Sequence, residues 1–188
     1  MNRREMLAWT GTGWLAAAVT GACAPFGSKA TTGPQGGNVM ADKVPREVLA
    51  RVWEEHVTKE FVVRDVEATL ATMTEDTSVT IVALNVGGRG KEGVRAFYRD
   101  VLIPTIPDDM QTTPVSRIVG DGYVVDELRF TFTHNKQMDW ILPNVAPTHR
   151  RVDLAHVVVV EFRGDKVLAE RVYWDQATVL RQVGLLKG

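Results

Sequence analysis

The pattern of apolar and polar positions predicts helices in the first half of the folded region and strands in the second. From Pro45 onward, Leu49, Val52, Trp53 and His56 recur at helical spacing, which predicts a first helix with one apolar side. The same reasoning predicts helices over 65–73, 91–103 and 176–183, and strands over 77–84, 114–119, 123–134, 151–162 and 167–175. This segregation indicates an α+β fold, with helices packed on one face of a curved, mainly antiparallel sheet.

A glycine-rich segment separates the first predicted strand from the helix over 91–103. Its residues, Gly87, Gly88, Arg89 and Gly90, lack the G-x-x-x-x-G-K-[ST] spacing of a phosphate-binding loop. We therefore expect a plain turn there.

The first 43 residues have the pattern of an export signal followed by a tether. Arg3 and Arg4 precede a weakly apolar stretch and resemble a twin-arginine export signal. The small residues before Cys23 resemble a lipoprotein box, so lipidation of Cys23 is expected; soluble release and an uncleaved anchor are the alternatives. We predict a signal over 1–23, a flexible linker over 24–43 and one domain over 44–188, located in the bacterial periplasm or cell envelope.

Composition narrows the class of protein further. The 188 residues are 45% hydrophobic and 24% charged, which is typical of a globular domain and not of a disordered chain. The net charge of −1 lacks the basic excess of nucleic-acid binders, so no nucleic-acid partner is expected. A single cysteine excludes an internal disulfide and a multi-cysteine metal site.

Three motifs carry a resemblance to a known family. GKEGVRAFY at 90–98, PTHRRV at 147–152, and the segment 164–175 that ends in YWD resemble the nuclear transport factor 2-like superfamily, in particular its SnoaL-like polyketide-cyclase and ester-cyclase group. The resemblance covers about 44–186. It implies a cone-shaped α+β fold, with a deep pocket between the N-terminal helices and the concave side of the sheet, and activity without a cofactor. It also implies a general acid/base on the last strand, where Asp175 is the matching position. His149 stands where the group commonly has glycine.

Three residues are candidates for proton transfer. His134 shares a strand face with Phe130 and Phe132, and Asp139 follows close by in the sequence. Asp175 comes directly after two aromatic residues, which would raise the proton affinity of its carboxylate. The structural alternatives are a hydrogen-bonded histidine at the pocket rim and an aspartate that caps the last helix.

Aromatic residues and further histidines are expected to shape the pocket. The predicted ligand-binding residues are Trp53, His56, Phe130, Phe132, Trp140, His156, Tyr173 and Trp174. His156 lies among apolar residues, so a satisfied core histidine is the simpler interpretation. His134, Asp139 and His156 lack the close spacing of a metal site, and none is predicted.

Three functions remain open. The first is an exported general acid/base enzyme, of the cyclase, isomerase or hydrolase type, that acts on a small hydrophobic carbonyl compound. The second is a non-catalytic module that binds a small apolar ligand at the cell envelope. The third is an epoxide hydrolase, which needs an arginine between two aspartates, such as Arg129 or Arg171. A homodimer through the outer face of the sheet is also expected, and membrane contact only through a lipid on Cys23.

Overall fold

The structure, a computed structural model, describes residues 43–187. The predicted signal over 1–23 and nearly all of the predicted linker over 24–43 lie outside the described residues. Within the described part, no helix combines the length and the apolar character needed to cross a membrane.

Apart from one additional strand, β2, helices and strands follow the expected order. The helices are α1 (Arg46–Val57), α2 (Val66–Leu70), α3 (Gly90–Phe97) and α4 (Gln176–Gln182). The π-helical turns η1 (Thr58–Val63) and η2 (Tyr98–Leu102) continue α1 and α3, and a short 3₁₀ turn, η3 (Ile103–Thr105), follows η2. The strands are β1 (Met73–Ile81), β2 (Val86–Arg89), β3 (Gln111–Val119), β4 (Tyr123–Thr133), β5 (Arg151–Arg163) and β6 (Lys166–Trp174).

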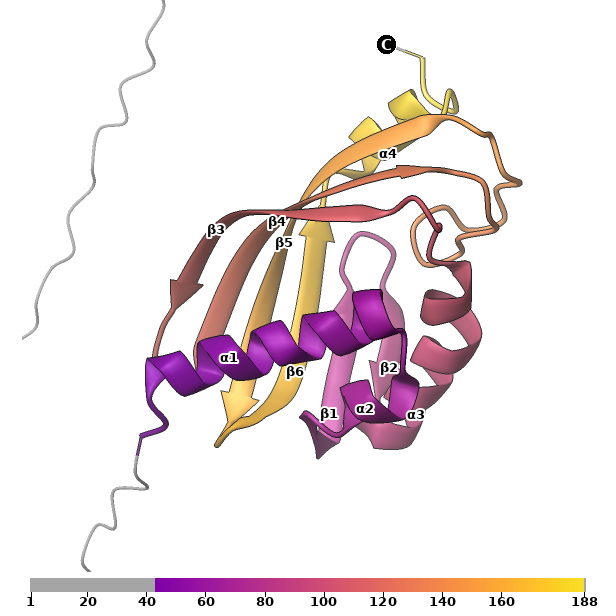
Figure 1. Ribbon diagram of the computed structural model, residues 1–188. Helices are drawn as coiled ribbons and strands as arrows, with labels where there is room; N and C mark the ends of the chain where they lie inside the picture. The colour runs from indigo at the N-terminus through magenta and orange to yellow at the C-terminus, as the bar shows by residue number, and fades with distance from the viewer. Residues whose placement is uncertain (1–42, 188) are drawn as a thin grey trace, which may run out of the picture. The chain divides into compact units, whose positions relative to one another are not determined.

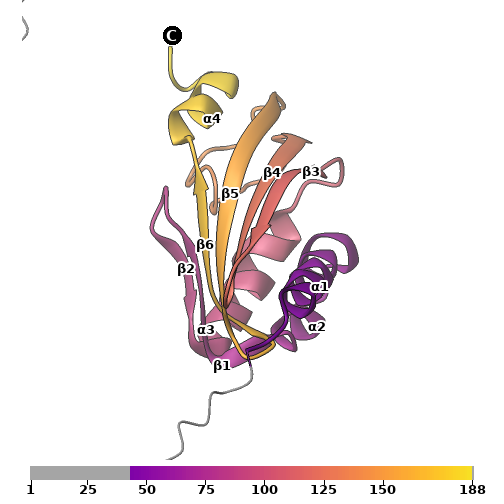
Figure 2. The ribbon, with the colours of Figure 1, turned by 90° about the vertical axis from the view of Figure 1, so that its left-hand side faces the viewer.

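All six strands form one curved sheet in the order β2-β1-β6-β5-β4-β3. Every neighbouring pair is antiparallel except β1 and β6, which run parallel. Helix α1 crosses the sheet in Figure 1, and Figure 2 shows α1 and α2 on the same side of the strands. The predicted α+β class and the mainly antiparallel, curved sheet are therefore confirmed.

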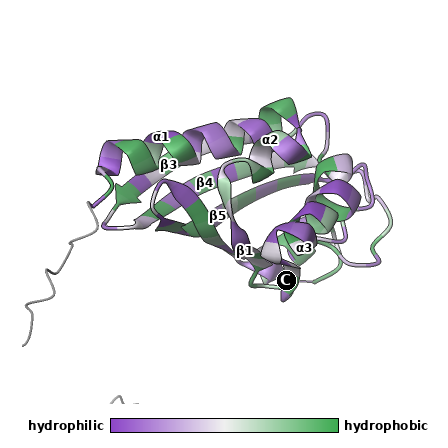
Figure 3. Cartoon of the chain, turned by 90° about the horizontal axis from the view of Figure 1, so that it is seen from below, coloured by the Kyte–Doolittle hydropathy of each residue, from purple (hydrophilic) through white to green (hydrophobic). Residues whose placement is uncertain are grey.

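Alternation along the strands and the helix determines which side chains face inward. In β4, Val124, Asp126, Leu128, Phe130 and Phe132 are buried, and the residues between them are more exposed. Figure 3 shows the corresponding mixture of apolar and polar residues along α1. Leu49, Trp53 and His56 form the buried side of that helix, as its spacing predicts.

The expected turn over 87–90 is wrong, because Val86–Arg89 forms the edge strand β2. Gly87 and Gly88 pair with Thr80 and Val79 of β1. A Cβ atom at Gly88 would lie 2.4 Å from the carbonyl oxygen of Gly93 in α3. The glycines therefore let the edge strand lie against the start of the helix. Because glycine has a low β propensity, the sequence of this strand does not predict a strand.

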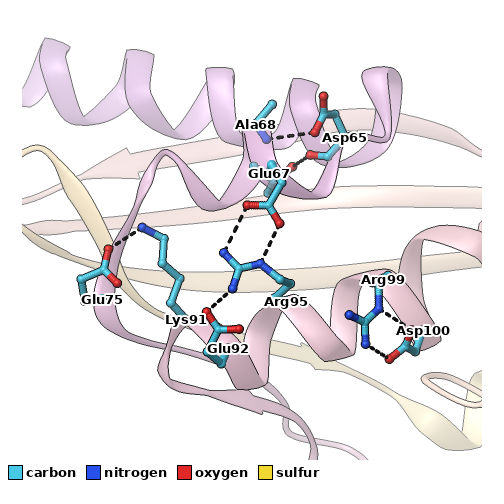
Figure 4. Close-up of polar contacts among 10 residues, drawn as sticks. Asp65, Glu67, Ala68, Glu75, Lys91, Glu92, Arg95, Arg99 and Asp100 are labelled. Carbon is cyan, nitrogen blue, oxygen red and sulfur yellow. Dashed lines mark hydrogen bonds and ion pairs between the residues drawn. The ribbon is translucent and has the colours of Figure 1, made fainter.

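Polar contacts hold α2 against α3. Arg95 of α3 donates to both carboxylate oxygens of Glu67 in α2, over 2.6 and 3.1 Å, and also pairs with Glu92 (Figure 4). At the start of α2, Asp65 accepts a hydrogen bond from the Ala68 backbone N–H over 3.0 Å. Aspartate is a favoured residue at this capping position. The helix ends at Leu70, earlier than expected, and β1 begins at Met73.

Candidate active site

A small apolar cavity of about 40 Å³ lies between the inner face of the sheet and the helices. Six phenylalanine and tryptophan rings are part of its wall, from α1, η1, α3, β4, β6 and the loop that holds Trp140. The lining residues are Trp53, Val57, Glu60, Phe61, Val79, Ile81, Phe97, Leu102, Thr112, Leu128, Phe130, Trp140, His156, Val158, Glu170, Val172 and Trp174. Ionisable side chains reach this apolar wall at three positions only, Glu60, Glu170 and His156, so they are its chemically distinctive feature.

The carboxylates of Glu60 and Glu170 both lie close to the imidazole of His56. His56 and Glu60 lie four residues apart on the continuous helix formed by α1 and η1, which places them on one face. Glu170 comes from the inner face of β6. The Nε2 atom of His56 lies 3.1 Å from Glu170 Oε1 and 3.5 Å from Glu60 Oε2. All three side chains are buried, so a cluster of charged groups stands at the edge of an apolar cavity.

A hydrogen bond at the other ring nitrogen of His56, Nδ1, fixes the orientation of the imidazole ring. His56 Nδ1 lies 2.7 Å from the Thr72 hydroxyl, and that hydroxyl donates to the backbone carbonyl of Thr69 over 2.7 Å. Since the threonine hydrogen is used in that bond, the Thr72 oxygen accepts from Nδ1–H. His56 Nε2 therefore faces the two glutamates in a defined ring orientation.

Burial and the mutual attraction of the groups shift their proton affinities. Burial alone lowers the pKa of His56, but the charge and hydrogen bond of Glu170, followed by those of Glu60, outweigh it and raise the pKa to about 10. Burial raises the pKa of Glu60; the hydrogen bond from His56 opposes this rise and the Glu170 charge adds to it. One imidazolium beside two carboxylates leaves an excess negative charge, so Glu60 is the group that gains a proton most readily.

Tyr98 closes the cluster from η2. Its hydroxyl donates to Glu170 Oε1 over 3.3 Å and lies 3.5 Å from His56 Nε2. Burial, together with the Glu170 and Glu60 charges, raises the pKa of Tyr98 well above its usual range. The phenol therefore stays neutral and acts as a hydrogen-bond donor within the cluster.

A third buried carboxylate, that of Asp126, supports the wall of the cavity. Asp126 of β4 accepts a hydrogen bond from Trp53 Nε1 over 2.8 Å and two from Arg117 of β3 over 2.7 and 3.0 Å. Trp53 also stacks on His56, with ring centroids 5.2 Å apart. Asp126 thus holds the indole that in turn packs against His56.

His156 presents an unused polar atom in the cavity wall. Its side chain is 2% exposed and lies against Phe130, with ring centroids 3.9 Å apart. Among the described residues Nδ1 has no hydrogen-bond partner. Burial lowers the pKa of His156 to about 4, so the ring is neutral near pH 7. The expectation of a satisfied core histidine is therefore wrong for this nitrogen.

The predicted aromatic pocket residues largely occupy the cavity wall. Trp53, Phe130, Trp140, His156 and Trp174 line it, and His56 lies directly behind Glu60 and Glu170. Two others do not line it: Phe132 is fully buried in the core, and Tyr173 is 40% exposed. Their ligand-binding roles stay predictions.

The structure does not bring Asp175, His134 and Asp139 together in this cavity. Asp175 is exposed and caps α4, accepting from Ala177 N–H over 3.0 Å and from the Thr178 hydroxyl over 2.6 Å. The Thr178 bond is the main reason that the pKa of Asp175 is lowered. In β6 it is Glu170, Val172 and Trp174 that face inward, so the residue after Trp174 leaves the strand away from the cavity.

The other two candidates are held by their own loop. The pKa of Asp139 is lowered by hydrogen bonds from the Asn144 backbone and the Gln137 side chain. His134 is buried, with Nδ1 accepting from Thr148 N–H over 3.2 Å, and burial followed by the His149 charge lowers its pKa. The expected proton-transfer centre therefore has no geometric support at these positions.

The arginine of the epoxide-hydrolase alternative is also missing from the cavity wall. Arg129 pairs with Asp153 and Arg171 with Glu161, and neither arginine lines the cavity.

Sequence reasoning missed Glu60 and Glu170 as site residues. Two signals were available: Glu60 follows His56 by one helical turn, and Glu170 alternates with Val172 and Trp174. Both glutamates look like surface residues until the fold buries them.

His56, Glu60 and Glu170 are also the residues that could hold a metal ion within the described part of the chain. Their ligand atoms lie within 4.8 Å of one another. A nitrogen and carboxylate oxygens suit a divalent cation. However, the raised pKa means that His56 keeps its proton near pH 7, and this proton competes with a metal for Nε2.

Comparison with known proteins places this fold and cavity in a family. The family model for SnoaL-like polyketide cyclases matches residues 49–183, so the chain belongs to that family. This confirms the resemblance found in the three motifs. A search of the curated proteins gave no match.

Solved structures show the same fold at low sequence identity. TsrD from Streptomyces laurentii is 17% identical, with a TM-score of 0.60 over 77% of this chain and 100% of that one. A SnoaL-like protein from Jannaschia sp. is 17% identical, with a TM-score of 0.58 over 73% and 94%. A nuclear transport factor 2-like protein of unknown function from Burkholderia pseudomallei is 21% identical, with a TM-score of 0.56 over 73% and 98%.

Proposed function

We propose that the domain is a cofactor-independent acid/base enzyme of the cyclase or isomerase type, acting on a small hydrophobic carbonyl compound. Membership of the SnoaL-like family supports the class of reaction. The observation that carries the proposal is a buried carboxylate, Glu60, in the wall of an apolar cavity with its pKa raised. A general base works best when its pKa lies near the working pH, and burial moves a glutamate in that direction.

Glu60 is the proposed proton acceptor and donor. In the ionised form its carboxylate takes a proton from the carbon next to the substrate carbonyl. The C–H electron pair moves into the enolate, and the negative charge develops on the carbonyl oxygen. Return of the proton to a different carbon gives an isomer. Attack of the enolate carbon on a second carbonyl of the same molecule gives a ring, and the alkoxide that forms takes the proton back from Glu60.

His56 and Glu170 act as positioning residues for Glu60. The imidazolium stabilises the ionised form of Glu60, and the Glu170 charge favours the protonated form, so the pair sets the balance between the two. Thr72 and Tyr98 hold the histidine and Glu170 in place through hydrogen bonds.

Hydrogen exchange at carbon tests the proposal without knowledge of the natural substrate. The protein is incubated with methyl alkyl ketones in deuterium oxide, and loss of the hydrogens next to the carbonyl is followed by proton NMR. We expect the wild type to accelerate exchange and Glu60→Gln to lower the rate by about a hundredfold or more. Glu47→Gln, an exposed glutamate on the same helix, is the control and keeps the wild-type rate.

Two outcomes would contradict the enzyme proposal. An unchanged exchange rate in a correctly folded Glu60→Gln variant removes Glu60 from the chemistry. Tight ketone binding without any exchange in the wild type favours the non-catalytic binding module instead.

We also propose that the protein is exported and lipidated at Cys23. The support is the paired arginines Arg3 and Arg4 and the small residues before the cysteine. Metabolic labelling with a radioactive fatty acid tests this: label in the wild type and none in Cys23→Ser is the expected result. Label in neither protein, with the wild type found in the soluble periplasm, contradicts lipidation.

A homodimer through the outer sheet face stays a prediction, and analytical ultracentrifugation of the domain tests it.

A further inference from the structure

Outside the cavity, an open groove runs between the α1–η1 helix and the edge strand β3. Its volume is about 530 Å³, against about 40 Å³ for the cavity. Val57, Phe61, Thr112 and Leu128 line both spaces, so the groove and the cavity share a common wall. The groove therefore adjoins the cavity on its solvent side, with these four side chains between the two spaces.

The size of the cavity limits what it can hold. A water molecule needs about 10–15 Å³ of such space, so the cavity accepts only a few non-hydrogen atoms. A carbonyl group with its neighbouring carbons fits this description, but a complete hydrophobic metabolite does not. The remainder of a ligand whose polar end is inside has to lie in the groove.

The side chains of the groove suit a hydrocarbon. Val62 is 76% exposed and Val115 is 57% exposed, and both line the groove from opposite sides. The charged lining residues offer no free cation, because Arg117 is paired with Asp126 and the remaining charge is that of Glu54. A carboxylate-bearing tail would be repelled, so the occupant is uncharged there.

The cavity wall also holds a polar atom without a partner among the described residues, the buried His156 Nδ1. A neutral imidazole can donate a hydrogen bond to a carbonyl oxygen or accept one from a hydroxyl. The carboxylates of Glu60 and Glu170 in the same wall disfavour an anionic end group.

We propose that the cavity and the groove form one two-part ligand site for an elongated, uncharged molecule. Its carbonyl or hydroxyl end binds His156 in the cavity, and its hydrocarbon body lies in the groove against Val62 and Val115. This inference rests on the proposed function for the nature of the reacting end, and it extends that function to the shape of the substrate and to His156 as a binding residue.

A chain-length series tests the groove by binding alone. Methyl n-alkyl ketones with butyl to decyl chains are titrated into the full-length protein, with fluorescence of the cavity tryptophans as the signal. We expect the affinity to rise about fourfold with each added methylene until the groove is filled. Equal affinity for the shortest and longest ketones would overturn the proposal.

Substitutions of exposed apolar residues inside and outside the groove distinguish binding in the groove from nonspecific hydrophobic binding. Val62→Glu and Val115→Glu should cancel the gain for long ketones and leave the affinity for the butyl ketone unchanged. Val63→Glu and Ile118→Glu are the controls, because these residues are 61% and 67% exposed and do not line the groove. If the controls weaken long-chain binding as much as the groove variants do, the groove is not the site.

His156→Phe tests the polar end, with circular dichroism to confirm folding. We expect the preference for a ketone over the alkane of the same length to be lost, while the dependence on chain length remains. A preference equal to that of the wild type would remove His156 from the proposal. His134→Phe is the control, because His134 is also buried and also has a ring nitrogen without a partner among the described residues. This variant should keep the wild-type preference for the ketone.

These binding results are independent of the enzyme proposal. Chain-length dependence without hydrogen exchange in the wild type contradicts the proposed catalysis but supports the two-part site. Hydrogen exchange without chain-length dependence supports catalysis and overturns the two-part site.

Discussion

The buried cluster at His56 predicts a loss of stability as the pH rises above neutral. The pKa of His56 is about 10 in the folded domain, against 6.5 for an ordinary histidine. Between these values the folded state holds one proton more than the unfolded state. Its stabilising contribution is therefore complete below about pH 6.5 and is lost as the pH rises through about 10. The raised pKa of Glu60 acts in the same direction.

The magnitude follows from linkage. One proton difference changes the free energy of unfolding by about 1.4 kcal/mol per pH unit. From about pH 7 to pH 9, the wild type should therefore lose up to roughly 3 kcal/mol. Glu170→Gln removes the largest attraction that raises the His56 pKa, so the variant should be less stable near pH 7 by about 3–5 kcal/mol and show a shallower fall.

Urea unfolding followed by tryptophan fluorescence at a series of pH values measures both effects. Glu161→Gln is the matched control, because Glu161 pairs with Arg171 away from the cavity and should keep the wild-type slope. A free energy of unfolding that stays constant or rises between about pH 7 and pH 9 in the wild type would refute the reasoning.

Three further substitutions test the packing around the site. Trp53→Phe removes the indole donor to buried Asp126 and should cost about 1–3 kcal/mol in urea unfolding; an unchanged midpoint would contradict the role of that bond. Gly88→Ala should lower stability by about 1–3 kcal/mol, because its new Cβ would meet the backbone of α3, whereas Gly93→Ala, with 3.8 Å of clearance, should be tolerated. Asp175→Ala should lower the melting temperature slightly through loss of the α4 cap and leave ketone exchange at the wild-type rate; a loss of exchange would restore Asp175 as a catalytic candidate.

Much of the fold could be predicted because its elements have strong periodicity. Alternation over β4 and the apolar stripe of α1 are local patterns, and both survive in the structure. The strand β2 was missed because close contact with α3 requires glycine at 88, and a glycine-rich strand looks like a turn.

The candidate site could be predicted only in part, because burial of polar residues depends on the assembled fold. The tryptophans of the cavity wall were predicted correctly, because large aromatic residues in a domain of this class are usually buried or line a pocket. Glu60 was missed because it looks like an ordinary polar helix residue, and only the packing of η1 over the sheet turns it into a buried acid. Asp175 was favoured for its aromatic neighbours, but the inward alternation of β6 ends at Trp174.

The most direct test of the account is the proton affinity of Glu60 in the folded domain. Carbon NMR of protein labelled at the glutamate side-chain carboxyls gives a titration curve for each glutamate, and Glu60→Gln identifies the signal of residue 60. The account predicts a carboxyl that titrates well above the ordinary range and whose signal disappears in Glu60→Gln. A Glu60 signal that titrates with an ordinary glutamate pKa would contradict the central claim that the apolar cavity holds a proton-transfer group.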